Sequence, residues 1–342
     1  MTGGSIFSPV FPAIGRFFPV KNFFKLGQFI PLAAVPHLIN FAFDPTAGKT
    51  SRFMLIRIGF DLIFELPAPV PMILMLYTHP SRSGSLSGPE VIQSSPAIPI
   101  STFTDNFGNR CGRVMAPAGQ LRLWHETLIR DSGLADPISP DAIQWDVHAL
   151  PPDAIQFLFA SRYCQTDELS QTAWNLFGNT PPGWARVQAV CDWVHNNIQF
   201  GYVYARPNKT ALDVFNERTG VCRDFSHLLI TFLRCLNIPA RYATGYLGDI
   251  GVPINPDPMD FSAWTEVFLD GRWYTFDARH NIPRIGRIVM ARGRDAVDVA
   301  ITTCFRPSQL VKFHVTTDGI PSDEDTIIRP QYASMPAVVQ VT

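Results

Sequence analysis

Cys222 begins the stretch of this sequence that is best suited to chemistry. Apolar residues follow it at steps of three and four, which predicts a helix whose core-facing stripe carries the thiol: Phe225, Leu229, Phe232 and Leu236. Gly220 suits a tight turn into this helix, and Pro239 prevents the helix from continuing. A thiol at a helix N-terminus lies among unpaired N–H groups and at the positive end of the helix dipole. Both favour the thiolate, so the sequence predicts a nucleophilic cysteine.

The segments around Cys222 show helical and strand patterns in turn. We expect helices at 167–177, 184–198, 211–218 and 222–236, and strands at 199–204, 240–247, 261–269, 272–278, 288–291, 299–305 and 310–315. Thr166 and Thr210 are the predicted N-caps of the first and third helices. Asp270 and Gly271 form a two-residue turn signal between the strands on either side of them. The fold class expected is α+β, with the cysteine helix packed against an antiparallel sheet.

The sequence before these helices is typical of a small antiparallel β domain. Apolar and polar residues alternate over 54–65 and 121–129, as they do in half-buried strands. Shorter strands are expected at 72–77 and 91–100, and a turn at 105–109 leads into a hairpin strand at 110–115.

Four parts of the chain follow from these patterns. They are an extension at 1–53 that we expect to be poorly ordered, a β-rich domain at 54–150, an α+β domain at 151–316 and a tail at 317–342. The extension is rich in Phe and Pro, and Met54 would be a natural start for the first strand. The alternative is that the extension anchors the protein at a membrane surface, although its apolar run at 28–43 is short for a spanning helix.

Composition narrows the classes of partner and cofactor. The net charge of -1 gives no general attraction to nucleic acid or to an acidic membrane. The six cysteines form no CxxC pair and no regular spacing, so neither a disulfide framework nor a zinc site is indicated. We therefore expect no metal or organic cofactor and a cytoplasmic location, and the sequence leaves the oligomeric state open.

Four blocks in fixed order resemble the transglutaminase-like superfamily, and its bacterial cysteine peptidases in particular. They lie at 219–225, 238–246, 260–267 and 271–277. The resemblance covers about 54–316, because the segment from Met54 looks like the β-rich domain that precedes this core in bacteria. It implies a papain-like fold in which a cysteine begins the central helix and a histidine and an aspartate on neighbouring strands complete a triad.

This resemblance assigns roles to individual residues of the chain. Cys222 matches the nucleophile and Asp277 matches the aspartate. Ser262 occupies the position where the family normally has its histidine. A serine hydroxyl cannot act as a general base near neutral pH or form an ion pair with a thiolate, so another group would have to take over.

The register of the predicted hairpin indicates which groups lie near Ser262. With the turn at 270–271, Ser262 opposes Arg279 and Trp264 opposes Asp277, so these four side chains share one face. Asp277 is then a diagonal neighbour of Ser262. His280 would point to the other face of a regular strand, but it follows the strand end and could turn back, which makes it the candidate base.

The remaining residues of interest have structural interpretations. We expect His227 to be a core histidine with one hydrogen bond, His195 to stabilise the C-terminus of its own helix, and Trp264 to be a core aromatic beside the site. A run of arginines is expected to form a solvated face: Arg279, Arg284, Arg287, Arg292 and Arg294.

Two functions follow from these expectations. In the first, Cys222 attacks an amide or peptide carbonyl to form an acyl-thioester that water resolves, with backbone N–H groups at the helix start holding the oxyanion. The substrate would be a peptide or protein. The alternative is a non-catalytic module that keeps the cleft and binds a peptide or protein partner, because Ser262 has replaced the histidine.

Overall fold

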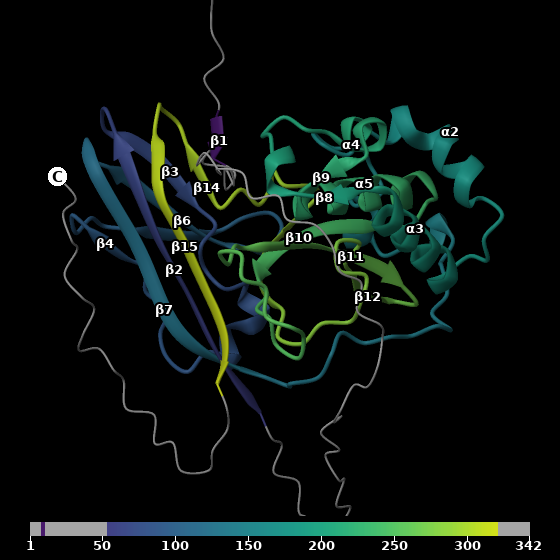
Figure 1. Ribbon diagram of the computed structural model, residues 1–342, viewed down its shortest axis with the longest axis horizontal. Coiled ribbons are helices and arrows are strands. Elements are labelled where there is room, and N and C mark those ends of the chain that lie inside the picture. Colours follow the sequence, from purple (N-terminus) through teal and green to yellow (C-terminus); the bar gives the residue numbers. More distant parts are fainter. Residues whose placement is uncertain (1–7, 11–52, 321–342) are drawn as a thin grey trace, which may run out of the picture.

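The computed structural model describes residues 8–10 and 53–320, which form a β-rich unit beside a unit of helices and sheet (Figure 1). The predicted extension at 1–53 falls outside this part of the chain except for residues 8–10 and 53, and so do residues 321–342 of the predicted tail. Within the described ranges, no helix has the length and apolar character needed to cross a membrane.

The β-rich unit consists of two antiparallel sheets. One has the order β15-β2-β7-β4, made by Gln309–Ile320, Met54–Leu66, Gly119–Asp131 and Gln93–Ser95. The other has the order β1-β14-β3-β6-β5, made by Ser8–Val10, Thr302–Cys304, Val70–Leu74, Arg110–Ala116 and Ser101–Thr104. The alternating apolar residues of β2 are buried between the sheets, as the period of two requires: Ile56, Ile58, Phe60, Leu62 and Phe64.

The predicted strands of this unit are confirmed in most places. β2, β6 and β7 lie where alternation predicts them, and the turn at 105–109 joins β5 to β6 as a hairpin. The strand predicted at 72–77 occurs as β3, two residues earlier. The predicted strand at 91–100 is reduced to the three residues of β4.

Two late strands correct the expected order of the chain. The strands predicted at 299–305 and 310–315 exist as β14 and β15, but they pair with β3 and β2 rather than with the sheet of the second unit. β15 also continues to Ile320, into the predicted tail. Alternation identifies a strand but not its partner, so sequence order was a poor guide here. The division near residue 150 stays a prediction.

Helices form the outer layer of the second unit (Figure 1). They are α1 Pro152–Ile155, α2 Thr166–Phe177, α3 Trp184–Asn197, α4 Ala211–Glu217 and α5 Cys222–Cys235. Thr210 caps α4 through a capping box with Asp213, as predicted. Thr166, however, is the first residue of α2 and its cap position is Gln165, so that predicted cap is wrong. The predicted strand at 199–204 shrinks to β8 Gln199–Phe200, which pairs in parallel with β9 Thr219–Gly220.

The sheet of the second unit packs against α5 on one face. Its order is β12-β11-β10-β13, made by Arg272–Phe276, Ser262–Leu269, Ala240–Tyr246 and Ile288–Gly293, and every neighbouring pair is antiparallel. The predicted stripe of α5 is buried in one core with side chains of this sheet, among them Ala240, Tyr242 and Val267. The fold is therefore α+β, with the cysteine helix packed on an antiparallel sheet as expected.

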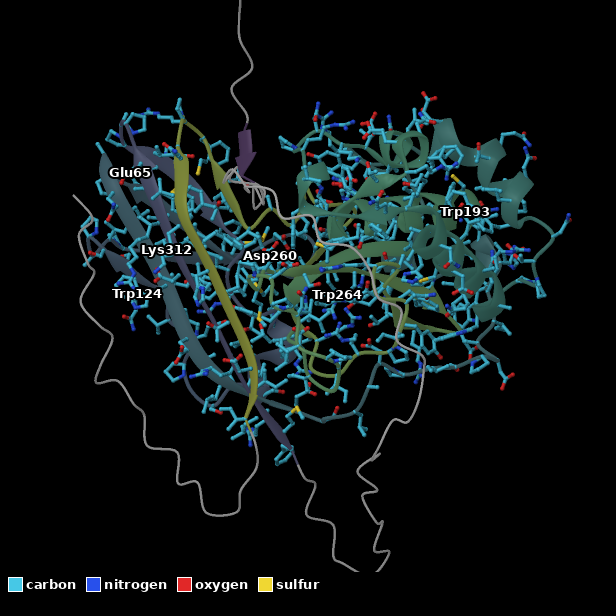
Figure 2. The ribbon with its side chains drawn as sticks, in the orientation of Figure 1. Glu65, Trp124, Trp193, Asp260, Trp264 and Lys312 are labelled. Carbon is cyan, nitrogen blue, oxygen red and sulfur yellow. The ribbon has the colours of Figure 1, made fainter. Side chains whose placement is uncertain are left out.

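The same sheet also contacts the β-rich unit. Tyr246, Phe261, Ile288 and Met290 belong to the core that β2 and its neighbours build. The Phe60 and Phe261 rings lie 6.4 Å apart across this junction. The sheet thus lies between the helices and the β-rich unit, and Asp260 and Trp264 lie near the middle of the molecule (Figure 2).

Candidate active site

Cys222 is the first residue of α5 and is buried, with 7 % of its surface exposed. The turn before it is closed by Asp224, whose Oδ2 accepts the N–H of Val221 at 3.0 Å. A Cβ added to Gly220 would lie 2.7 Å from the Cβ of Asp224. Gly220 is therefore needed for this close approach, and the tight turn expected from sequence is not its role.

Asp224 is held in place by Arg223. The Nε and Nη2 atoms of Arg223 donate to Asp224 Oδ1 at 3.0 and 2.9 Å, and Nη2 also donates to the Arg206 carbonyl at 2.6 Å. Burial raises the pKa of the Asp224 carboxyl, and Arg223 opposes that effect. The first turn of α5 is fixed by these contacts, so the position of the thiol does not depend on an exposed loop.

The thiol of Cys222 is not ionised by its surroundings. Burial raises its pKa to about 11, whereas the Arg279 guanidinium and the N–H of Ala263 lower it and Asp260 raises it further. Desolvation thus opposes the expected thiolate in the unliganded protein, and the nucleophilic role of Cys222 stays a prediction. The sulfur nevertheless has a positive group nearby, and it is not sealed in hydrocarbon alone.

Asp277 and His280 form the hydrogen-bonded pair that a base would require. His280 Nδ1 lies 2.8 Å from Asp277 Oδ2, and Arg287 Nη2 donates to the same oxygen at 2.9 Å. The other oxygen accepts the backbone N–H groups of Arg279 and His280 at 3.1 and 3.2 Å. Burial alone would raise the pKa of Asp277, but Arg287 and His280 hold it well below its ordinary value. An ionised Asp277 therefore orients the His280 ring.

The chain turns back immediately after β12, which brings His280 to Asp277. Asn281 N–H donates to the Asp277 carbonyl at 2.7 Å, and Asn281 has a left-handed φ of 51° that asparagine tolerates. The face that a regular strand would have given His280 is therefore not the one it occupies.

Residues of α3 hold this turn from behind. His195 Nδ1 lies 3.0 Å from the Ala278 carbonyl, and Asn281 Nδ2 donates to Asp192 Oδ1 at 2.8 Å. Gln188 Nε2 donates to Asn281 Oδ1 at 3.1 Å. His195 lies in the last turn of α3, as expected, and its ring also contacts the turn beside Asp277.

Ser262 begins β11 and pairs with Gly245 of β10. The predicted hairpin register is confirmed from Leu269 opposite Arg272 to Thr265 opposite Phe276. The ladder stops there, so Ser262 and Arg279 are not a paired position. Both still line one pocket.

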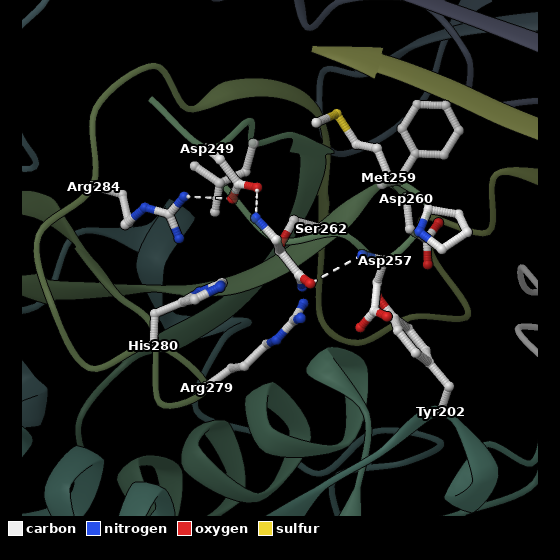
Figure 3. A pocket seen from close by; sticks show the side chains of 13 residues that line it. Tyr202, Asp249, Asp257, Met259, Asp260, Ser262, Arg279, His280 and Arg284 are labelled. Atoms are coloured by element: carbon white, nitrogen blue, oxygen red, sulfur yellow. Dashed lines mark hydrogen bonds and ion pairs between the residues drawn. The ribbon is translucent and has the colours of Figure 1, made fainter. Parts of the chain in front are cut away.

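That pocket opens where the loop before β11 faces the turn after β12 (Figure 3). Its lining comes from three parts of the second unit: Tyr202, Leu247, Asp249, Asn255, Asp257, Pro258, Met259, Asp260, Phe261, Ser262, Arg279, His280 and Arg284. Arg279 and His280 reach in from one side, with Asp260 and Met259 on the other. Cys222 does not line the pocket, but three of the lining residues are electrostatically coupled to it, namely Tyr202, Asp260 and Arg279.

Arg279 is a site residue that sequence reasoning placed wrongly on a solvated face. Its guanidinium carbon lies 3.9 Å from the centroid of the Phe200 ring, and Phe200 pairs with Gly220 two residues before Cys222. The available signal was the hairpin register, which put Arg279 on the face of Ser262 and Asp277.

Other arginines of that run are buried or half-buried rather than solvated. Arg287 pairs with Asp136 at 2.7 Å as well as with Asp277. Arg284 pairs with Asp249 at 3.5 Å, and Arg292 pairs with Glu266 at 2.7 Å. Only Arg294 of the later members fits the expectation, since 45 % of its side chain is exposed. These arginines can be buried because each pairs with an acid that is far away in the sequence, and the spacing of residues along the chain does not reveal such pairs.

Two structural interpretations are confirmed. His227 is fully buried, and its Nε2 accepts the N–H of Ala296 at 3.1 Å, as expected of a core histidine with one hydrogen bond. Trp264 is 1 % exposed and packs with Ala243 and Val289, as expected of a core aromatic beside the site.

Asp260 is the second site residue that sequence reasoning missed. Both of its carboxyl oxygens are buried, and neither has a hydrogen-bond partner in the described part of the chain. Burial raises its pKa to about 7, and the nearby N–H of Phe261, which does not meet the geometry of a hydrogen bond, and the charge of Arg279 only partly oppose this. Its place two residues before Ser262 was the one signal available.

The six cysteines, including Cys222, are free thiols. Across residues 8–10 and 53–320, no group of three His, Cys, Asp or Glu side chains is arranged to hold a metal ion.

Comparisons with known proteins agree with this arrangement. The family model described as the Transglutaminase-like superfamily matches residues 171–278. A crystal structure of a "putative cysteine protease" from Cytophaga hutchinsonii is 31 % identical, with a TM-score of 0.68, and the alignment covers 80 % of this chain and 93 % of that one. The chain belongs to the transglutaminase-like superfamily. The family resemblance and the fold that it implied are thus confirmed.

The chain is also similar to an uncharacterized protein of Mycobacterium leprae. It is 27 % identical over 117 residues, which are 33 % of this chain and 42 % of that protein. The chain therefore matches less than half of that relative's length. The superfamily match contains Cys222, Ser262 and Asp277 and ends two residues before His280.

Proposed function

We propose that this protein is a transglutaminase-like cysteine hydrolase that cleaves amide or peptide bonds through an acyl-thioester on Cys222. The observation that carries this proposal is the Asp277–His280 pair, whose ring lies in the wall of the same pocket as Ser262. The pair supplies an oriented imidazole from His280. The family's usual histidine position, Ser262, offers only a hydroxyl. Peptide or protein as substrate, and the cytoplasm as location, stay predictions from the sequence.

The reaction starts with transfer of the Cys222 proton to His280. The sulfur attacks the carbonyl carbon, and N–H groups at the start of α5, including that of Cys222, hold the oxyanion. His280 then protonates the leaving amine, which departs as the acyl-thioester forms. Water attacks the thioester after giving a proton to His280, and the carboxylic acid leaves as the thiol is restored.

Ionisation of Cys222 is the step that the unliganded protein opposes. A pKa of about 11 leaves roughly one thiol in 10⁴ ionised at pH 7, which corresponds to about 5 kcal/mol. Arg279 opposes this cost, because its guanidinium lies over Phe200 beside the start of α5. We expect the proton transfer to His280 to be coupled to substrate binding.

A second candidate function is a non-catalytic peptide- or protein-binding module. The specific observations that favour it are Ser262 in the usual histidine position and the burial of Cys222. In this case the pocket binds its partner without a covalent step. The two functions differ in whether Cys222 becomes acylated.

Acylation by p-nitrophenyl acetate, followed by peptide mapping of the adducts, distinguishes the hydrolase from the non-catalytic module. Cys235 is a matched thiol, since it also lies on α5, is also 7 % exposed and has a pKa raised to about 12 by burial. A hydrolase acetylates Cys222 far faster than Cys235 and then releases acetate. Equal slow labelling of both thiols would reject the hydrolase in favour of the module. Replacing His280 by Gln should slow the Cys222 reaction, whereas His148→Gln at an exposed histidine should not.

A further inference from the structure

Asp260 is the acid of the pocket that is both buried and unpartnered. Asp249, in the same lining, pairs with Arg284 and accepts the N–H of Asn255 at 2.8 Å. The two oxygens of Asp260 are buried and accept no hydrogen bond from the described residues. Asp257 adds a further acidic side chain on an exposed residue of the same loop.

A buried carboxyl without donors is unfavourable for the folded protein. The great majority of buried polar groups in native proteins are hydrogen-bonded, because an unsatisfied one keeps the full cost of its lost hydration. Burial also raises the pKa of Asp260 to about 7, so a large fraction of this group is neutral at that pH. A ligand that brings donors and positive charge would relieve both effects.

The cation already present near Asp260 does not satisfy it. Arg279 is close enough to lower the Asp260 pKa, but no ion pair joins the two within the described chain. The guanidinium of Arg279 lies over the Phe200 ring, and its charge also opposes the rise that burial causes in the pKa of Tyr202. The carboxyl of Asp260 is therefore left without a donor although a cation lines the same pocket.

We propose that Asp260 binds a primary ammonium group of the substrate close to the carbonyl that Cys222 attacks. Asp260 lies two residues before Ser262, lines the pocket with it and is electrostatically coupled to the Cys222 thiol. The substrate class is thus an amide or peptide with a free amino group near the bond that is cleaved. This inference rests on the proposed function, which supplies the acyl-thioester step.

Methanethiosulfonate reagents of different charge test the proposal on the full chain. The Cys222 thiolate attacks the sulfenyl sulfur, a mixed disulfide forms and methanesulfinate leaves. The aminoethyl reagent places an ammonium group two carbons from the new disulfide, and the methyl reagent is its neutral counterpart. We expect the ratio of the Cys222 labelling rates, aminoethyl over methyl, to be about tenfold or more above the same ratio for Cys235.

Substitutions distinguish a direct contact between Asp260 and the ammonium group from a general attraction by the acidic surface. Asp260→Asn should bring the ratio down to that of Cys235, while Asp270→Asn, at an exposed acid outside the pocket lining, should leave it unchanged. A buried contact also survives 0.5 M salt, whereas attraction between exposed charges is largely screened there. A wild-type ratio equal to that of Cys235, a ratio unchanged in Asp260→Asn, or a ratio lost in salt would overturn the proposal.

Binding of an ammonium compound to the Cys222→Ala protein tests the ammonium site separately from the hydrolase proposal. Butylammonium should raise the melting temperature of the Cys222→Ala protein, butanol should not, and Asp260→Asn should abolish the difference. Stabilisation without any acylation of Cys222 would reject the hydrolase but keep the ammonium site. Acylation of Cys222 without a preference for the ammonium compound in either assay would keep the hydrolase and reject the ammonium site.

Discussion

His280 Nδ1 and Arg287 Nη2 both contact the same oxygen of Asp277, at 2.8 and 2.9 Å. The carboxylate thus receives a fixed positive charge from one side and orients an imidazole on the other. This arrangement keeps Asp277 ionised and lets His280 offer its other nitrogen to the pocket. The catalytic role proposed for His280 depends on both contacts: Arg287 keeps Asp277 ionised, and Asp277 orients the His280 ring.

Asp277→Asn should slow acylation of Cys222 by roughly 10²–10⁴-fold, because the amide no longer holds the tautomer of His280 that a general base requires. It should also destabilise the protein by about 3–5 kcal/mol, since Arg287 loses one of its two carboxylates in a buried site. The p-nitrophenolate burst and urea unfolding measure the two effects. Asp298→Asn, at a surface pair with Arg294, is the matched control. An unchanged burst from folded Asp277→Asn would exclude the pair from catalysis.

Ser262→His should raise the acylation rate of Cys222, because it restores an imidazole at the family's usual position in the pocket wall. A gain of about tenfold or more is expected, given that a general base typically contributes 10²–10⁴-fold. The double variant with His280→Gln should retain that gain. Ser87→His, on an exposed residue, controls for added imidazole. No gain in Ser262→His, with the fold intact, would show that a missing base is not what limits the reaction.

Asp260 should make the free energy of unfolding depend on pH. Its pKa is about 7 in the folded protein and 3.8 ordinarily, so the folded state binds more protons between those values. Stability is therefore fully present below about pH 4 and is lost as the pH rises to about 7. Asp260→Asn should match wild type at pH 4 and exceed it at pH 8 by on the order of 1–3 kcal/mol in urea unfolding. Equal gains at both pH values for Asp260→Asn would contradict the linkage.

Gly220→Ala should destabilise the protein by about 1–3 kcal/mol, because the new Cβ would lie 2.7 Å from the Cβ of Asp224. Asp224 has to shift, and the first turn of α5 shifts with it, so the acylation rate of Cys222 should fall as well. Gly88→Ala is the control, since nothing lies within 4 Å of its added Cβ. Thermal unfolding of both variants checks the difference. Similar melting temperatures for the two would mean that the close approach at Gly220 is unimportant.

Local patterns predicted the parts of the fold that local physics determines. The stripe after Cys222 gave α5, and the turn at Asp270 and Gly271 gave the correct register of β11 and β12. Both signals lie within a few residues of the structure they specify. The family resemblance and the α+β class followed from them together with the order of the four blocks.

The remaining features depend on residues far apart in the chain. The position of His280 is fixed by contacts from α3, including His195 and Gln188, about ninety residues earlier. Arg287 is buried because Asp136 reaches it from the segment before the helices. The same reason explains Cys222: its place on α5 was predictable, but it is buried in a core that includes Ala263 and Ala278, some forty or more residues later in the chain.

The return of β15 to the edge of β2 has a consequence for synthesis. Residues 309–320 are made after every helix of the second unit, yet they complete a sheet whose other strands lie at 54–131. During translation β2 must therefore wait with one edge unpaired until the end of β15 leaves the ribosome. A shortened chain that stops before residue 309 would keep that edge exposed permanently, and we expect it to aggregate.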